Sequence, residues 1–128
     1  MAQSVGVVGV SQIGYAAAIP DRTLEELIFE ASSSALADAG LAWREVDGVV
    51  IAASDLVDGR VISSMVTSGP AGGYMKDIVN VASSGEHALV LAALQILAGL
   101  FETALVVSWS KCSEAPVGHV ERLSLDPF

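Results

Sequence analysis

Short runs of apolar, largely β-branched residues alternate along this chain with longer segments of helical periodicity. Four runs are expected to form strands, at residues 5–10, 46–53, 78–81 and 103–109. Their apolar character is continuous, which is typical of strands buried on both faces of a parallel sheet. The alternation therefore predicts an α/β fold, with a mostly parallel sheet of about four strands and helices on its faces.

The segment after the first predicted strand carries signals for both ends of a helix. Thr23 and Glu26 have the spacing of a capping box, in which each side chain accepts from the other residue's backbone N–H. Gly40 is placed to end the helix as a left-handed C′ residue. Apolar side chains recur at helical spacing between these signals, at Leu24, Leu27, Ile28, Ala31, Ala35, Leu36 and Ala39. We expect an amphipathic helix over residues 24–39.

A second long helix is predicted between residues 83 and 100. Its sequence is apolar almost all the way round, which predicts a buried central helix at residues 85–100. A short helix is expected at residues 61–66, followed by a loop at 68–73 that is rich in glycine. Residues 110–128 form a tail without clear periodicity, and nothing divides the 128 residues into two domains.

Charge and cysteine content limit the partners and the compartment. The formal net charge of −9 argues against nucleic acid and anionic membrane as partners. The single cysteine, Cys112, allows no internal disulfide, so a reducing cytoplasm is the expected location. Residues 88–109 are strongly apolar, but polar interruptions and a change of period indicate a helix followed by a strand, not a membrane span.

The junction between the third predicted strand and the second long helix is the clearest candidate site. The strand at 78–81 passes directly into the helix through Ala82, Ser83, Ser84 and Gly85. The free N–H groups and the positive dipole end of a helix converge at such a junction, where they favour an anion or a developing oxyanion. Ligands of open α/β sheets also gather at the carboxyl ends of the strands.

This junction and its surroundings resemble the N-terminal half-domain of thiolases, above all the sterol-carrier-type and lipid-transfer thiolase-like proteins. The resemblance rests on residues 82–85, the apolar helix up to Ala98-Gly99, the strand Ala104-Leu105-Val106-Val107 and the stretch 108–113. It extends to residues 5–9, 35–41 and 46–49, and so covers nearly the whole chain. It implies one N-terminal thiolase-like domain at residues 1–128, acting on a coenzyme A thioester without a metal in this chain.

Two departures from the family pattern shape the functional hypotheses. Ala82 occupies the position of the reactive cysteine, so an acyl-enzyme cannot form there. The family's second half, with its catalytic histidine and second cysteine, lies beyond Phe128. The first hypothesis is a subunit of a split acyltransferase or aldolase whose partner is a second thiolase-half chain, with a zinc-ribbon OB-fold protein in the aldolase case. The alternative is a non-catalytic interaction subunit, and a third interpretation is a fragment of a longer protein.

The resemblance also implies homodimerisation through strand 78–82, with Asn80 and the loop at 69–76 at the interface. The other face of the helix at 85–100 would meet the second half-domain. Four strands would cover only part of that helix, which is the sequence-based reason to expect a partner.

Ser83 and His87 are the candidate catalytic residues near Ala82. Ser83 and Glu86 have the spacing of a second capping box, and this structural role is favoured. The alternative makes Ser83 a nucleophile with His87 as its base. The backbone N–H groups of Ser84 and Gly85 are expected to form an oxyanion or anion site.

The remaining candidates favour structural roles. Cys112 lies beside Lys111, which could lower its pKa, but it matches an ordinary methionine position of the family. His119 with Cys112 and His87 does not have zinc-ligand spacing, so no metal site is expected. Asp55 and Asp58 lie in a turn-like segment where solvated carboxylates are common. The N-terminal glycines lack the spacing of a dinucleotide-binding motif, and no Walker motif is present.

Overall fold

The computed structural model describes residues 4–53, 64–82 and 84–114, together with residues 116 and 118. Three parallel strands form the central sheet: β1 (Gly48–Ala52), β2 (Asp77–Val81) and β3 (Ala104–Ser108). Their order is β2-β1-β3, with Gly48 in register with both Asp77 and Ala104. The predicted α/β fold with a parallel sheet is confirmed.

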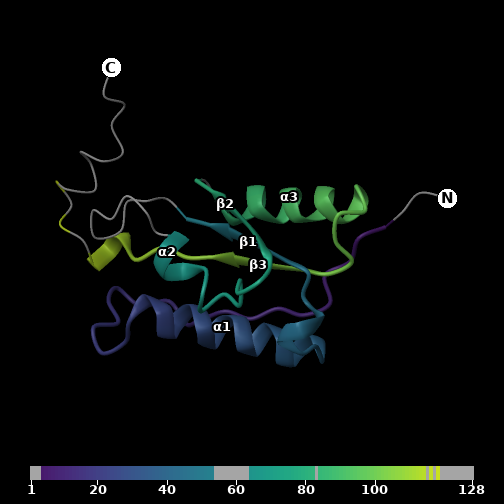
Figure 1. Ribbon diagram of the computed structural model, residues 1–128. Helices are drawn as coiled ribbons and strands as arrows, with labels where there is room; N and C mark the ends of the chain where they lie inside the picture. Colours follow the sequence, from purple (N-terminus) through teal and green to yellow (C-terminus); the bar gives the residue numbers. More distant parts are fainter. Residues whose placement is uncertain (1–3, 54–63, 83, 115, 117, 119–128) are drawn as a thin grey trace, which may run out of the picture.

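Two helices cover the opposite faces of this sheet. Helix α1 (Leu24–Ala39) packs on one face and α3 (Gly85–Leu97) on the other (Figure 1). The shorter elements are α2 (Ser64–Thr67) and the 3-10 turns η1 (Trp43–Glu45) and η2 (Cys112–Glu114). No helix within the described ranges has the length and apolarity needed to cross a membrane.

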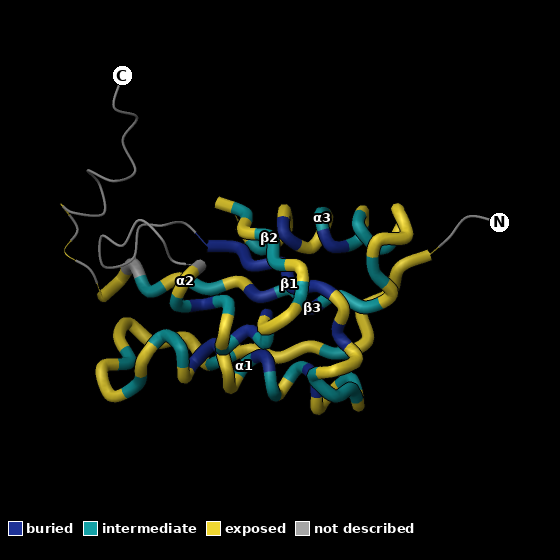
Figure 2. Tube along the Cα trace, viewed as in Figure 1, coloured by how far each residue is buried: buried dark blue, intermediate teal, exposed yellow. Residues whose placement is uncertain are grey.

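The central strand forms the core because both of its faces are covered. All five residues of β1 are buried, and Figure 2 shows this strand as the darkest part of the trace. Val49 and Ile51 contribute to the cluster on the α1 side, while Val50 and Ala52 contribute to the cluster on the α3 side. This division follows from the two-residue period of a strand.

Helix α1 begins and ends as its sequence predicts. The Thr23 hydroxyl accepts from the backbone N–H of Glu26 at 3.2 Å, and the Glu26 carboxylate accepts from the backbone N–H of Thr23 at 2.8 Å. Gly40 follows with φ 68°, and its N–H donates to the carbonyl of Ala37 at 3.2 Å. The capping box and the C-terminal glycine are therefore confirmed.

The predicted strand at residues 5–10 is wrong, and the described sheet has three strands instead of about four. This segment runs beside α1 in an extended course, and the backbone N–H of Val10 donates to Asp38 Oδ2 at 2.8 Å (Figure 1). Both edges of β1 are already occupied by β2 and β3, so the segment has no position beside the central strand. Val7, Val8 and Val10 remain exposed as a result.

Helix α3 is shorter and less covered than predicted. The helix ends at Leu97, and Gly99, two residues later, has a left-handed φ of 73°. Within the helix, only Ala88 and Ala92 are buried. The described part of the chain covers one face of this helix. The opposite face exposes Leu89, Val90, Leu94 and Leu97, so the expectation of a helix buried all round is wrong for this chain by itself.

Candidate functional site

The carboxyl ends of the three strands meet at one edge of the sheet because the strands are parallel. Two backbone bonds extend the pairing past the strand ends: the N–H of Ala53 donates to Val81 at 3.1 Å, and that of Trp109 donates to Ala52 at 3.2 Å. The N-terminus of α3 lies at the same edge. A Cβ atom added to Gly85 would lie only 3.1 Å from the side chain of Ser108.

The predicted oxyanion residues lie at this edge. Ala82 follows β2 directly and is exposed, while Ser83 lies outside the described residues. Gly85 is the first residue of α3, so its N–H is among the helix donors that have no partner within the helix. The predicted cap at Ser83 is wrong by one position, because the N-cap of α3 is Ser84, with extended backbone angles of φ −78° and ψ 165°.

The hydroxyl of Ser84 has two side-chain partners. Its Oγ lies 3.1 Å from Nδ1 of His87, and it also hydrogen-bonds the carboxylate of Glu86. The bond to Ser84 is the main cause that lowers the pKa of Glu86, followed by a bond from the backbone N–H of Glu86 itself. No backbone N–H of α3 donates to Ser84 Oγ, so this serine caps the helix without a side-chain cap bond.

Either group can donate in the contact between Ser84 Oγ and His87 Nδ1, because the imidazole tautomer sets the direction of this bond. The contact brings the candidate base His87 beside Ser84 at the start of α3.

The structure does not describe the side chains of the other residues singled out in the sequence. His119, Asp55 and Asp58 lie outside the described residues. Cys112 begins the 3-10 turn η2, and its side chain lies outside the description as well. In the described ranges, no group of three or more His, Cys, Asp or Glu side chains could hold a metal ion.

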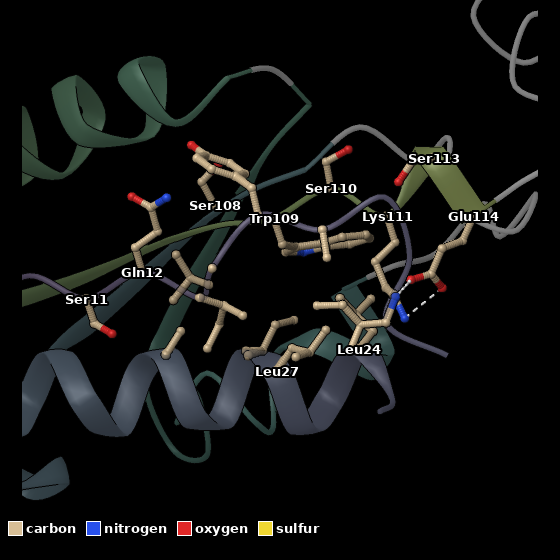
Figure 3. Close-up of a pocket in the computed structure, with 18 residues that line it drawn as sticks. Ser11, Gln12, Leu24, Leu27, Ser108, Trp109, Ser110, Lys111, Ser113 and Glu114 are labelled. Carbon is tan, nitrogen blue, oxygen red and sulfur yellow. Dashed lines mark hydrogen bonds and ion pairs between the residues drawn. The ribbon is translucent and has the colours of Figure 1, made fainter. Parts of the chain in front are cut away.

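A pocket of about 500 Å³ opens beside the same edge, between α1, the loop at residues 11–19 and the segment that follows β3. Its lining is apolar where α1 faces β3 and polar at the rim. The apolar lining residues include Leu24, Leu27, Ile28, Ala31, Val107 and Trp109, and the polar ones include Ser11, Gln12, Ser108, Ser110 and Ser113. Figure 3 shows Trp109 above Leu24 and Leu27, with Ser108 and Ser110 on the side away from α1.

An ion pair lies among the residues that line this pocket. Lys111 Nζ lies 2.9 Å from Glu114 Oε2 and also donates to the carbonyl of Arg22 at 3.3 Å (Figure 3). The second oxygen of Glu114 accepts from the backbone N–H of Ile19 at 2.8 Å. The bond from Ile19, followed by the bond from Lys111, lowers the pKa of Glu114. These contacts tie the loop at 11–19 to the segment after β3.

The sequence did not reveal this pocket. Its walls come from three segments separated along the chain, and the bond between Ile19 and Glu114 spans 95 residues. The only local signal is the position of Trp109 and Lys111 directly after a strand, at the edge where ligands of α/β sheets bind.

Comparison with known proteins finds two relatives that are similar to this chain in sequence. No family model matches the sequence. The chain is 38% identical over 101 residues to beta-ketoacyl-(acyl-carrier-protein) synthase III 4 of Streptomyces coelicolor, a match that covers 74% of this chain and 31% of the relative. It is 35% identical over 100 residues to beta-ketoacyl-(acyl-carrier-protein) synthase III 2 of Streptomyces avermitilis. This match covers 73% of the present chain and 31% of the relative.

The fold is that of a thiolase-like half-domain. The half-domain matches less than a third of the length of either relative. Its candidate site consists of the α3 N-terminus with Ala82, Ser84 and Gly85, and the adjoining pocket beneath Trp109. These two parts share Ser108, which lines the pocket and lies against Gly85.

Proposed function

We propose that this chain is one subunit of a split thiolase-like enzyme that forms or cleaves a carbon–carbon bond in an acyl-coenzyme A thioester. The observation that carries the proposal is the N-terminus of α3 at the carboxyl edge of the sheet, preceded by Ala82. The similarity to two named beta-ketoacyl synthases supports acyl-thioester chemistry. A partner chain would supply the acid and base, as the resemblance to thiolases implies.

The role of this chain is to bind and polarise the substrate carbonyl. The N–H groups of the first turn of α3, including those at Ser84 and Gly85, would stabilise negative charge on the thioester or enolate oxygen. The helix dipole adds to this effect at the same end. Ala82 leaves space where the family has a cysteine, so the substrate would react without being attached to this chain.

The native complex tests this function. The chain is tagged at its N-terminus and purified from its own host, and the accompanying chains are identified by mass spectrometry. A second thiolase-half chain with the missing histidine and cysteine favours acyl transfer, whereas a zinc-ribbon OB-fold protein favours aldol chemistry. The complex should release coenzyme A from an acyl-coenzyme A, or cleave its carbon–carbon bond, while the intact mass of this chain stays unchanged. An acyl adduct on this chain would contradict the mechanism.

The alternative is a non-catalytic interaction subunit of a thiolase-like complex. This version rests on assembly through β2. That strand is at an edge of the described sheet, and Asn80 on it is exposed, so a copy could pair along it. Light scattering after size exclusion tests the dimer. A folded monomer at micromolar concentration would argue against both assembly proposals.

A further inference from the structure

The loop at residues 11–18 forms one side of the pocket beneath Trp109 but makes few contacts of its own. Every residue of the loop except Ile13 is exposed, and Tyr15 is 95% exposed. Within the part of the chain that the structure describes, no hydrogen bond joins residues 11–18 to another segment. A segment with so little burial and no hydrogen bonds has low local stability.

Two carboxylates hold the ends of this loop. The backbone N–H of Val10 donates to Asp38 Oδ2 on α1, and that of Ile19 donates to Glu114 Oε1, both at 2.8 Å. The other oxygen of Glu114 lies 2.9 Å from Lys111 Nζ, so the carboxylate is itself held in place. Hydrogen bonds to an ionised carboxylate are stronger than those between neutral groups. The loop is therefore fixed at two points and free between them.

Trp109 adds a cost to the closed position of the loop. Its indole Nε1 is buried, and it has no hydrogen-bond partner among the described residues. The ring lies above Leu24 and Leu27 of α1 and lines the same pocket as the loop (Figure 3). A buried N–H without a partner has lost its bond to water, and that loss is recovered when water enters the pocket. The closed position thus depends on the two anchors more than on packing.

We infer that residues 11–18 form a strap that opens and closes the pocket beneath Trp109, with Glu114 as its latch. When Glu114 releases the N–H of Ile19, the strap moves about its other anchor at Val10 and admits water and small neutral molecules. Loop opening of this kind occurs on the microsecond to millisecond timescale. The inference goes beyond the proposed function, because the pocket lies on the α1 face of the sheet and its access does not depend on thioester chemistry.

Hydrogen exchange measured by NMR on the intact chain tests the latch. In Glu114→Ala, the amide of Ile19 should exchange about tenfold faster or more, because its charge-assisted bond is lost. The indole N–H of Trp109 should also exchange faster, since the open strap lets water reach it. The indole of Trp43, which does not line this pocket, is the internal reference. Glu102→Ala removes an equal charge at an exposed position before β3 and should change neither rate.

Relaxation dispersion on the unsubstituted chain tests the motion itself, and it applies even where Glu114→Ala does not fold. Residues 12–18 should show microsecond to millisecond exchange that residues 4–9 lack. Flat dispersion across the strap would overturn the inference. An unchanged Ile19 exchange rate in Glu114→Ala, or an equal increase in Glu102→Ala, would overturn the latch. Faster exchange at Ile19 with an unchanged Trp109 indole would show that the strap does not close this pocket.

Discussion

Ser84 lies between a carboxylate and an imidazole at the start of α3. Its hydroxyl hydrogen-bonds the carboxylate of Glu86, and its Oγ lies 3.1 Å from Nδ1 of His87. The proposed function uses the backbone N–H groups at this helix start to stabilise negative charge on the substrate.

The bond from Ser84 to Glu86 makes a testable prediction about the carboxylate. Replacing Ser84 with alanine removes the main cause that lowers the pKa of Glu86, so this pKa should rise toward its ordinary value of 4.5. NMR titration of the Glu86 side chain measures the change. Ser34→Ala, on the exposed face of α1, is the control and should leave this pKa unchanged. An unaltered Glu86 titration in Ser84→Ala would contradict the bond between these two side chains.

Asp47 connects the starts of β1 and β3 and makes stability depend on pH. Its Oδ2 accepts from the backbone N–H groups of Glu102 at 2.9 Å and Thr103 at 3.0 Å. The bond from Thr103, followed by that from Glu102, lowers the pKa of Asp47 below its ordinary value of 3.8. A carboxyl group with a lowered folded-state pKa contributes stability that is complete above 3.8 and is lost as the pH falls through the folded-state pKa.

Asp47→Asn should therefore lower the urea midpoint at neutral pH. The neutral amide accepts more weakly than the carboxylate, so the variant loses part of the charge-assisted bonding. The difference between the two midpoints should shrink as the pH falls below 3.8, because Asp47 then becomes protonated in the parent protein. A difference that is the same at neutral and acidic pH would show that the substitution acts by another route.

At the scale of elements, local signals were read correctly from the sequence and non-local pairing was not. The capping box at Thr23 and the glycine at position 40 act within a few residues of their own helix, so both were predictable. The β-branched residues at 5–10 indicate an extended backbone but do not say what it pairs with. In the structure, β2 and β3 occupy the two positions beside β1.

For the candidate site as well, the sequence predicted the local part and not the part that depends on distant residues. The junction from β2 to α3 could be located because small residues link an apolar strand to an apolar helix. The choice between Ser83 and Ser84 as the cap was not, since adjacent serines carry nearly the same signal. The pocket requires the loop at 11–19 to lie against the segment after β3, and no short-range pattern encodes that contact.

A substitution at Gly9 tests the observed position of the N-terminal segment on α1. A Cβ atom at this residue would lie 2.5 Å from the carbonyl oxygen of Ala35 and 2.7 Å from the Cβ of Ala39. Gly9→Ala should therefore destabilise the protein by about 1–3 kcal/mol, because helix backbone cannot move aside cheaply. Chemical denaturation measures the loss in free energy of unfolding.

Gly6→Ala is the matched control for this substitution. A Cβ atom at Gly6 meets nothing within 4 Å, and its φ angle is not positive. This variant should be neutral, or more stable by up to about 1 kcal/mol through the reduced entropy of the unfolded chain. Equal effects of the two alanines would place residues 4–10 elsewhere in the protein.

At the scale of the whole molecule, the helices on the two faces of the sheet differ in how far their outer sides are covered. Helix α1 is covered in part by the N-terminal segment, whereas the outer side of α3 is exposed (Figure 2). The exposed positions of α3 include large apolar residues. Leu89, Val90, Leu94 and Leu97 are between 44% and 59% exposed. A contiguous apolar surface of this kind marks an interaction site in most proteins. The resemblance to thiolases predicts that the second half-domain would meet this face.

Leu94→Glu is the substitution that tests this face as the site of the partner chain. Leu94 is 56% exposed on α3, so a carboxylate there stays hydrated in the free chain, and the free energy of unfolding should change by less than about 0.5 kcal/mol. In the complex, the same carboxylate would be buried without a partner, at a cost that weakens association severely. The second thiolase-half chain should no longer co-purify with the variant. Met65→Glu, at a 78% exposed position on α2, should retain that chain. Retention by both variants would mean that the partner binds elsewhere and that the apolar face of α3 serves another contact.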